Sequence, residues 1–188
     1  DNTRRYFEYY FRGVPSILRG HKNSVAILMG NETESQLKAL THDLFRYFGL
    51  GCRSVSQIYL PVGYAKESLF PYFEDYHEIL YNHHKYMNNY LYHKSIMMVN
   101  KVPFLDNGFV MMTENEQIAS PISVIHYQYY TSIDEMIQKL KQMESSIQCV
   151  VTDNDFIPSH IGFGHAQKPS LNDYADGIDV MEFLLSLK

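Results

Sequence analysis

The sequence predicts an α/β domain with a mostly parallel sheet flanked by helices. Two continuous apolar runs, residues 24–29 and 147–152, are typical of strands buried on both faces. Segments with helical periodicity separate the expected strands, and strands that alternate with helices favour parallel pairing. With 188 residues, 45% of them hydrophobic, the chain is long enough to bury a core of its own.

The first helices and strands are marked by their end signals. Residues 4–12 predict a short aromatic helix, and Asn31 is the expected N-cap of a second helix, with Glu34 three residues later. Gly49 is expected to end that helix. Its apolar face carries Leu37, Leu40, Leu44 and Phe48. Residues 55–61 then predict the second strand.

The alternation continues through the rest of the chain. A long helical stretch is expected over residues 67–100, with a break near Asn82. Ser132 and Glu135 form a capping-box pattern at the start of a helix that runs through Met143. Further strands are expected at 108–113, 122–129 and 147–152, an irregular segment at 153–169, and a last helix at 179–187. No repeat or linker divides residues 1–188, which we interpret as one domain.

Composition excludes several classes of function. The formal net charge of −5 gives no basic footprint for nucleic acid, and no apolar run reaches the roughly 18 residues that a membrane span needs. The two cysteines, Cys52 and Cys149, are too few for a disulfide framework and fit free thiols in a reducing cytoplasm. The chain begins without an initiator methionine or a signal peptide, so we expect a fragment with more protein upstream.

A glycine-flanked thiol is the most informative feature. Cys52 follows Gly49 and Gly51 in a loop between a helix and a strand. Glycines let a backbone approach a ligand closely, and main-chain N–H groups near Gly51 can receive a developing oxyanion. Arg53 would favour the thiolate, which is the attacking form. The alternative is that Cys52 is a small buried hydrophobe, which is our interpretation of Cys149 in the middle of its strand.

Four stretches of the chain carry a recognisable pattern. The first is Phe48-Gly49-Leu50-Gly51-Cys52-Arg53-Ser54-Val55-Ser56. The others are Pro103-Phe104-Leu105-Asp106-Asn107-Gly108-Phe109, Ser120-Pro121-Ile122-Ser123-Val124 and Gln167-Lys168-Pro169-Ser170-Leu171-Asn172-Asp173-Tyr174-Ala175-Asp176-Gly177. In this order along the chain they resemble the acyl-CoA reductase (LuxC-like) family of the aldehyde dehydrogenase superfamily. The order strand, helix, Gly-x-x-Cys, strand over residues 23–61 is similar to the superfamily around its catalytic cysteine.

The resemblance implies a reductive reaction in an aldehyde dehydrogenase-like catalytic domain. A fatty acyl group, from acyl-CoA or an acyl-carrier donor, would acylate Cys52, and NADPH would reduce the thioester to the aldehyde. A homo-oligomer is implied for the full-length enzyme. The dinucleotide-binding domain would lie upstream, because no stretch of this chain resembles Gly-x-Gly-x-x-Gly, so we expect the isolated chain not to be fully active.

Two departures from ordinary aldehyde dehydrogenases bear on the reaction. The superfamily's Glu-Leu-Gly-Gly-Lys element reads Leu18-Arg19-Gly20-His21-Lys22 here, and Leu18 cannot deprotonate water as the glutamate does. The Glu-x-Phe-Gly-Pro element reads Gln117-Ile118-Ala119-Ser120-Pro121. Gln117 is therefore the candidate cofactor contact, through an amide in place of a carboxylate, with a polar strand-edge residue as the alternative.

Histidines give weaker signals. His165 lies in a loop similar to the superfamily's late Phe-Gly-Gly segment, which makes it a candidate substrate contact. His126 is either a proton donor or, more simply, a satisfied structural histidine. His77 and His84 share a helical stretch but lack metal-ligand spacing, so we expect no metal site.

Other functions stay open from the sequence. An aldehyde dehydrogenase that works in the oxidative direction would use the same thiol, although Leu18 speaks against it. A non-catalytic acyl-binding or oligomerisation module needs no reactive thiol. A cysteine–histidine hydrolase is a more distant alternative, because no histidine or acid lies near Cys52 in a matching pattern.

Overall fold

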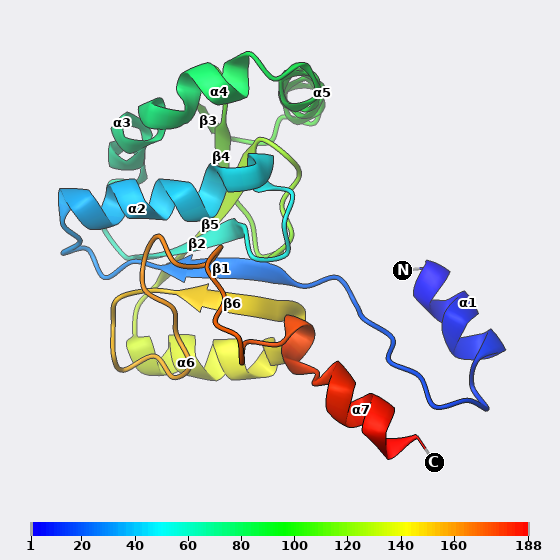
Figure 1. Ribbon diagram of the computed structural model, residues 1–188. Coiled ribbons are helices and arrows are strands. Elements are labelled where there is room, and N and C mark those ends of the chain that lie inside the picture. Colours follow the sequence, from blue (N-terminus) through cyan, green and yellow to red (C-terminus); the bar gives the residue numbers. More distant parts are fainter. Residues whose placement is uncertain (1, 188) are drawn as a thin grey trace.

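A six-stranded sheet in the order β3-β4-β5-β2-β1-β6 forms the centre of the computed structural model, which describes residues 2–187 (Figure 1). Within this part of the chain every strand pairing is parallel except that of β3 with β4. The strands are β1 (Asn23–Ile27), β2 (Val55–Pro61), β3 (Leu105–Asp106), β4 (Met111–Glu114), β5 (Val124–Tyr130) and β6 (Ile147–Val151). The predicted α/β class with a mostly parallel sheet is confirmed.

Helices cover both faces of this sheet. In Figure 1, α2 and the α3–α5 region lie over one face, and α6 lies over the other. The α-helices are α1 (Asn2–Tyr10), α2 (Glu34–Phe45), α3 (Phe70–Phe73), α4 (His77–Tyr81), α5 (His84–Val99), α6 (Ile133–Gln142) and α7 (Val180–Ser186). Short 3₁₀ turns connect several of them, including η1 (Arg46–Gly49) after α2. None of the helices in residues 2–187 combines the length and the apolar character needed to span a bilayer.

The helix α2 begins two residues later than predicted. Thr33, not Asn31, is its N-cap, and Thr33 forms the capping box with Gln36. The carboxylate of Glu32 instead accepts hydrogen bonds from the backbone N–H groups of Met29 and Gly30, so the segment between β1 and α2 is a turn. The predicted apolar face is confirmed for the helix itself, since its three leucines are buried; they are Leu37, Leu40 and Leu44.

The end of α2 also differs from the expectation. The helix stops at Phe45, and Tyr47 and Phe48 both adopt left-handed backbone angles, with φ of 57° and 61°. Phe48 therefore does not extend the apolar face of the helix. Its ring stacks on that of His83, with centroids 3.9 Å apart, and this contact packs the turn before the thiol loop against the start of α5.

Two strands begin later than the apolar pattern predicted, because each is preceded by a turn. Asn107 Oδ1 accepts hydrogen bonds from the backbone N–H groups of Phe109 and Val110 at 3.3 and 3.0 Å, so β4 begins only at Met111. Ser123 has a φ of +67°, and β5 starts directly after it. The expected strand over residues 55–61 coincides with β2.

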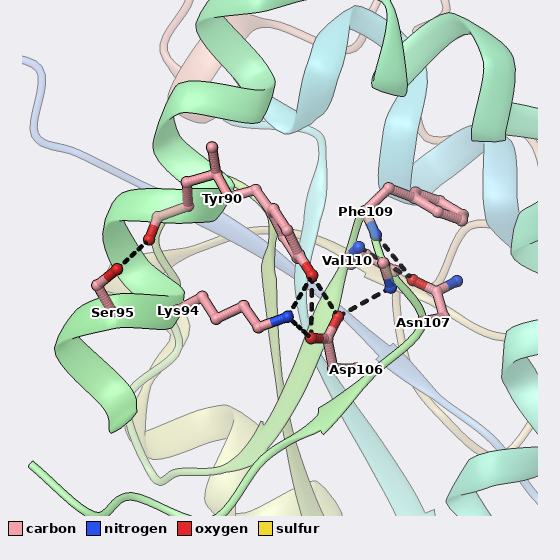
Figure 2. Close-up of polar contacts among 9 residues, drawn as sticks. Tyr90, Lys94, Ser95, Asp106, Asn107, Phe109 and Val110 are labelled. Carbon is pink, nitrogen blue, oxygen red and sulfur yellow. Dashed lines mark hydrogen bonds and ion pairs between the residues drawn. The ribbon is translucent and has the colours of Figure 1, made fainter. Parts of the chain in front are cut away.

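A polar brace joins the antiparallel edge strand β3 to α5 (Figure 2). The Asp106 carboxylate accepts hydrogen bonds from the Tyr90 hydroxyl at 2.7 and 2.9 Å and pairs with the Lys94 ammonium at 2.6 Å. Lys94 Nζ also donates to the Tyr90 hydroxyl at 3.1 Å. The brace fixes the far edge of the sheet, opposite β1 and β6.

The helices near the two ends of the described chain expose apolar side chains. Asp179 caps α7 by accepting from the backbone N–H groups of Met181 and Glu182, which confirms a helix close to the predicted range. No described side chain of α1 or α7 is buried. Leu185 on α7 is 79% exposed and Tyr10 on α1 is 72% exposed, so these helices contribute little to the core.

Candidate functional site

The thiol loop lies where β1 and β2 begin. Cys52 precedes β2 and is exposed, whereas Ser24, in β1, is fully buried. The Ser24 hydroxyl donates a hydrogen bond of 2.9 Å to the carbonyl oxygen of Cys52, and the Ser54 N–H donates one of 2.9 Å to the Gly51 carbonyl. The loop backbone is thus held from two sides while the thiol stays accessible.

The two glycines of this loop differ in how strongly the backbone requires glycine. Gly49 has a φ of +70°, which an L side chain rarely adopts. Gly51 does not have a positive φ, but a Cβ atom there would lie 3.4 Å from Ser54 Oγ. The left-handed backbone therefore favours glycine at position 49, whereas a methyl group at position 51 would only touch Ser54.

Arg53 is held by two partners next to the thiol. Its Nε donates to the carbonyl oxygen of Ala166, and its Nη2 pairs with Asp173 Oδ2 at 2.6 Å, with 13% of the Arg53 side chain exposed. Burial alone would lower the pKa of Arg53, but the bond to Asp173 and the nearby thiols Cys149 and Cys52 raise it overall. Arg53 is therefore a cation held in one position near both cysteines, and the carboxylate of Asp173 partly neutralises its charge.

Cys149 differs from Cys52 in its surroundings. It is 4% exposed, in β6, which pairs with β1. Burial raises the pKa of the Cys149 thiol, although the charge of Arg53 and a contact with Ser24 oppose that rise. The expectation of a buried structural thiol in the middle of its strand agrees with this burial.

The loop over residues 162–167 lies beside the thiol loop. Gln167 Nε2 donates to Ser54 Oγ at 3.2 Å, and the Ala166 carbonyl receives Arg53. His165 is exposed, and its Nδ1 donates to the carbonyl of Phe163 at 2.9 Å. The structure therefore brings the loop that contains the candidate His165 next to the candidates Cys52 and Arg53. The side chains of His165 and Cys52 do not form a hydrogen bond with each other.

The Gln117 segment is anchored to the start of β2 and to β5. Ser56 Oγ donates to the Ile118 carbonyl at 2.6 Å, and Gln57 Nε2 donates to the Asn115 carbonyl at 2.9 Å. His126 Nδ1 donates to the carbonyl of Gln117 at 2.7 Å. The Gln117 side chain itself is exposed. Because Ser56 follows Cys52 by only a few residues, the segment lies at the same end of the sheet as the thiol.

His126 has the satisfied structural environment that was the simpler interpretation. It is 2% exposed, and burial lowers its pKa despite the opposing hydrogen bond to Gln117. Among the residues that the structure describes, no group of three or more histidine, cysteine, aspartate or glutamate side chains converges on a metal-sized site.

His83 is a helix cap: its Nδ1 accepts a hydrogen bond of 3.1 Å from the Tyr86 N–H at the start of α5.

Two hollows lie near these elements, and Cys52 lines neither. The larger, of about 850 Å³, runs between α6, β6 and residues 172–177, and Asp173, the partner of Arg53, forms part of its wall. The smaller, of about 30 Å³, lies between η1 and the turn before β5. The smaller one suffices for a water molecule and not for an acyl chain.

Sequence reasoning missed three residues of this site: Ser24, Asp43 and Asp173. Asp43 is fully buried in α2 and accepts hydrogen bonds from the backbone N–H groups of Gly164 and Ala166. An acidic residue between Leu40 and Leu44 on an apolar helix face is the signal that could have found it. Asp173 lies in one of the family-like stretches, but the sequence alone does not join it to Arg53.

Several solved structures of aldehyde dehydrogenases are similar to this chain in fold. Indole-3-acetaldehyde dehydrogenase in complex with NAD⁺ superposes with a TM-score of 0.53 at 10% identity, over 82% of this chain and 39% of that enzyme. The aldehyde dehydrogenase KauB from Pseudomonas aeruginosa gives 0.52 at 9% identity, over 81% and 39%. The NAD⁺ complex of the Bacillus cereus aldehyde dehydrogenase gives 0.52 at 12%, over 82% and 38%. The chain shares the fold of an aldehyde dehydrogenase domain.

This similarity is one of fold. The chain spans about two fifths of the length of these enzymes. It has no match among protein-family models or among curated proteins. The expected aldehyde dehydrogenase-like fold is therefore confirmed, and the narrower family and its reaction are matters for proposal.

Proposed function

We propose that this chain is the thiol-bearing catalytic unit of an acyl-CoA reductase. The Cys52 thiolate attacks the carbonyl carbon of a fatty acyl-CoA or acyl-carrier thioester, the donor thiolate leaves, and an acyl-cysteine thioester remains. Hydride addition to that carbonyl carbon and departure of the Cys52 thiolate then give the aldehyde. An exposed thiol in a loop fixed by Ser24, on an aldehyde dehydrogenase fold, is the observation that supports this proposal most.

Neighbouring groups support the thiol in two ways. The guanidinium of Arg53 lies within electrostatic reach of Cys52, and a nearby cation favours a thiolate. Main-chain N–H groups of the Gly51–Cys52 turn are the candidate donors to the oxyanion that forms when the carbonyl is attacked. Because Asp173 pairs with Arg53, the cation is held in place and its charge is moderated.

NADPH fits this chain only in part. When bound, it supplies the hydride for the reduction. The exposed Gln117 amide, at the thiol end of the sheet, is suited to hydrogen-bond a ribose hydroxyl. The remaining contacts to a dinucleotide would come from the upstream domain that the family resemblance implies. The preference for NADPH rests on the family resemblance, and the compared structures contain NAD⁺.

Leu18 favours reduction over oxidation to a free acid. At the position where the resemblance places a glutamate base, an aliphatic side chain cannot activate water. The acyl-enzyme would then persist long enough to be reduced. The oxidative aldehyde dehydrogenase reaction is the nearest alternative, and comparing aldehyde-to-acid turnover with CoA-dependent turnover separates the two.

The proposal is tested by acylation of the thiol. We expect the 188-residue chain, incubated with a fatty acyl-CoA, to gain the mass of one acyl group on the peptide that contains Cys52. Cys52→Ala should abolish the adduct and Cys149→Ala should leave it unchanged. An adduct that persists at another residue of the Cys52→Ala variant would refute the assignment of the nucleophile.

A second candidate function, a non-catalytic acyl-binding or oligomerisation module, is favoured by the exposed apolar faces of α1 and α7. Such a module would bind a fatty acyl-CoA without forming a covalent adduct. Its association state would depend on those helices and not on Cys52. The acylation experiment therefore distinguishes this function from the proposed one.

A further inference from the structure

Asp43 is an aspartate where helix physics disfavours one. It lies in the last turn of α2, on the face that carries Leu40 and Leu44, and its side chain is fully buried. A carboxylate near the C-terminus of a helix meets the negative end of the helix dipole, and burial disfavours its charge further. A carboxylate that is unfavourable both for the helix dipole and for burial indicates that another contact compensates for the cost.

The compensating contact is with the loop over residues 162–167. Asp43 Oδ2 accepts a hydrogen bond of 2.6 Å from the Gly164 N–H, and Oδ1 accepts one of 3.0 Å from the Ala166 N–H. Burial raises the pKa of Asp43, and these two hydrogen bonds and the nearby His165 and His42 offset only part of that rise. One carboxylate thus fixes two backbone positions of the loop.

The loop also approaches α2 closely at position 164, where a side chain would be strained. Gly164 has a φ of +80°, and a Cβ atom there would lie 3.0 Å from the Cβ of Ala39. Ala39 precedes Asp43 by one turn of the helix. The loop is therefore seated on α2 at two neighbouring places, by close packing and by hydrogen bonds.

The opposite side of the same loop holds the residues that follow Cys52. The Ala166 carbonyl accepts from Arg53 Nε, and Gln167 donates to Ser54 Oγ at 3.2 Å. We propose that Asp43 is a positioning residue of the thiol site: it fixes the 162–167 loop, and through the Ala166 carbonyl it fixes the guanidinium of Arg53 beside Cys52. This inference rests on the proposed function, in which Cys52 is the nucleophile.

The test is the rate at which iodoacetamide alkylates Cys52 in the 188-residue chain at neutral pH, measured by mass spectrometry of its peptides after digestion. Asp43→Asn keeps the shape but turns an NH₂ group toward one of the two N–H donors. We expect the Cys52 rate at neutral pH to fall about threefold in the folded variant, because the Arg53 guanidinium is no longer held in place beside the thiol. Gly164→Ala should act in the same direction, by displacing the loop while Asp43 keeps its charge.

Asp106→Asn is the matched control. It makes the same change in a hydrogen-bonded aspartate at the opposite edge of the sheet, where it should lower stability and leave Cys52 alkylation unchanged. Circular dichroism shows which variants are folded. If Asp43→Asn does not fold, the alkylation rate of Gly164→Ala provides the test. Loss of folding in both variants at a denaturant level that Asp106→Asn survives would assign Asp43 a purely structural role and overturn the proposal.

Unchanged alkylation in the folded variants, or an equal fall in Asp106→Asn, would also overturn it. The readout needs no acyl-CoA. A chain whose Cys52 alkylation responds to Asp43→Asn but which accepts no acyl group would thus remove the proposed function and retain the positioning role. Conversely, acylation of Cys52 with alkylation rates insensitive to Asp43 would remove the positioning role alone.

Discussion

The buried hydroxyl of Ser24 donates a hydrogen bond to the main-chain carbonyl of the exposed Cys52, over 2.9 Å, and so joins β1 directly to the thiol loop. Ser24 also lies against the thiol of Cys149 in the neighbouring strand β6. One small side chain therefore contacts both the backbone of the accessible Cys52 and the thiol of the buried Cys149. We therefore expect the loss of the Ser24 hydroxyl to loosen the thiol loop more than the sheet.

Replacing Ser24 by alanine should lower the free energy of unfolding by about 1 kcal/mol, because the Cys52 carbonyl loses its donor and a small void remains. Urea denaturation followed by circular dichroism measures this change. Ser16→Ala, at an exposed serine, is the control and should leave the midpoint where it is. Equal midpoints for the Ser24 and Ser16 variants would show that the hydrogen bond contributes nothing to stability.

The two thiols should differ in reactivity. Cys52 is exposed, whereas Cys149 is 4% exposed and burial raises its pKa. We expect iodoacetamide to label Cys52 at least about tenfold faster than Cys149 in the folded chain. Peptide mass spectrometry at successive times gives both rates, and labelling in urea, where both thiols are open, is the reference. Equal and slow labelling of the two in the folded chain would favour the non-catalytic module.

The strands β1, β2 and β6 were predictable because their signals are local, whereas the two-residue strand β3 was not expected. The apolar runs around β1 and β6 and the span of β2 are properties of consecutive residues. The start of α2 was not predictable from the sequence, because Asn31 with Glu34 and Thr33 with Gln36 are both plausible capping pairs. What selects Thr33 is that the Glu32 side chain folds back onto Gly30 and makes the preceding residues a turn.

The site was predictable only where a motif carries it. Cys52 stands out from its glycines and from the family-like stretch. Asp43 binds Gly164 across 121 positions of the chain, and Arg53 binds Asp173 across 120. No periodicity or local spacing reports contacts of that range. Such partners emerge only when the fold brings the 162–173 region back over the start of β2.

Acidification should weaken the Gln117 segment through His126. Burial lowers the pKa of His126 below the ordinary value of 6.5, so the neutral form is favoured in the folded chain. The unfolded chain then binds the proton first as pH falls, so the contribution to stability is fully present above pH 6.5 and is lost as pH falls through the lower folded value. Unfolding free energies measured by urea denaturation from pH 8 to pH 5 should decline across this window.

His126→Asn is the variant that assigns this decline. The asparagine amide can still donate toward the Gln117 carbonyl but does not titrate. We expect a flatter pH dependence between pH 8 and pH 5 than in the parent chain. A parent slope retained in His126→Asn would place the titrating group elsewhere.

The brace between α5 and β3 should govern the response to stronger acid. Burial alone would raise the pKa of Asp106, but the hydrogen bonds from Lys94, the Gly108 N–H and Tyr90 lower it below the ordinary 3.8. A carboxyl whose folded pKa is depressed contributes stability that is complete well above pH 3.8 and is lost as pH falls through the folded value. Lys94→Met should lower the unfolding free energy at neutral pH by about 0.2–1 kcal/mol, the range measured for solvent-exposed ion pairs.

The same variant should also shift acid unfolding. Without Lys94 the folded pKa of Asp106 moves back toward its ordinary value, so the part of the stability that depends on its ionisation shrinks and unfolding begins at higher pH. Circular dichroism between pH 2 and pH 6 follows the midpoint. Lys85→Met, at an exposed lysine of the same helix, removes a charge without touching Asp106 and should shift the midpoint less. If the two lysine variants shift it equally, net charge and not the brace sets the acid limit.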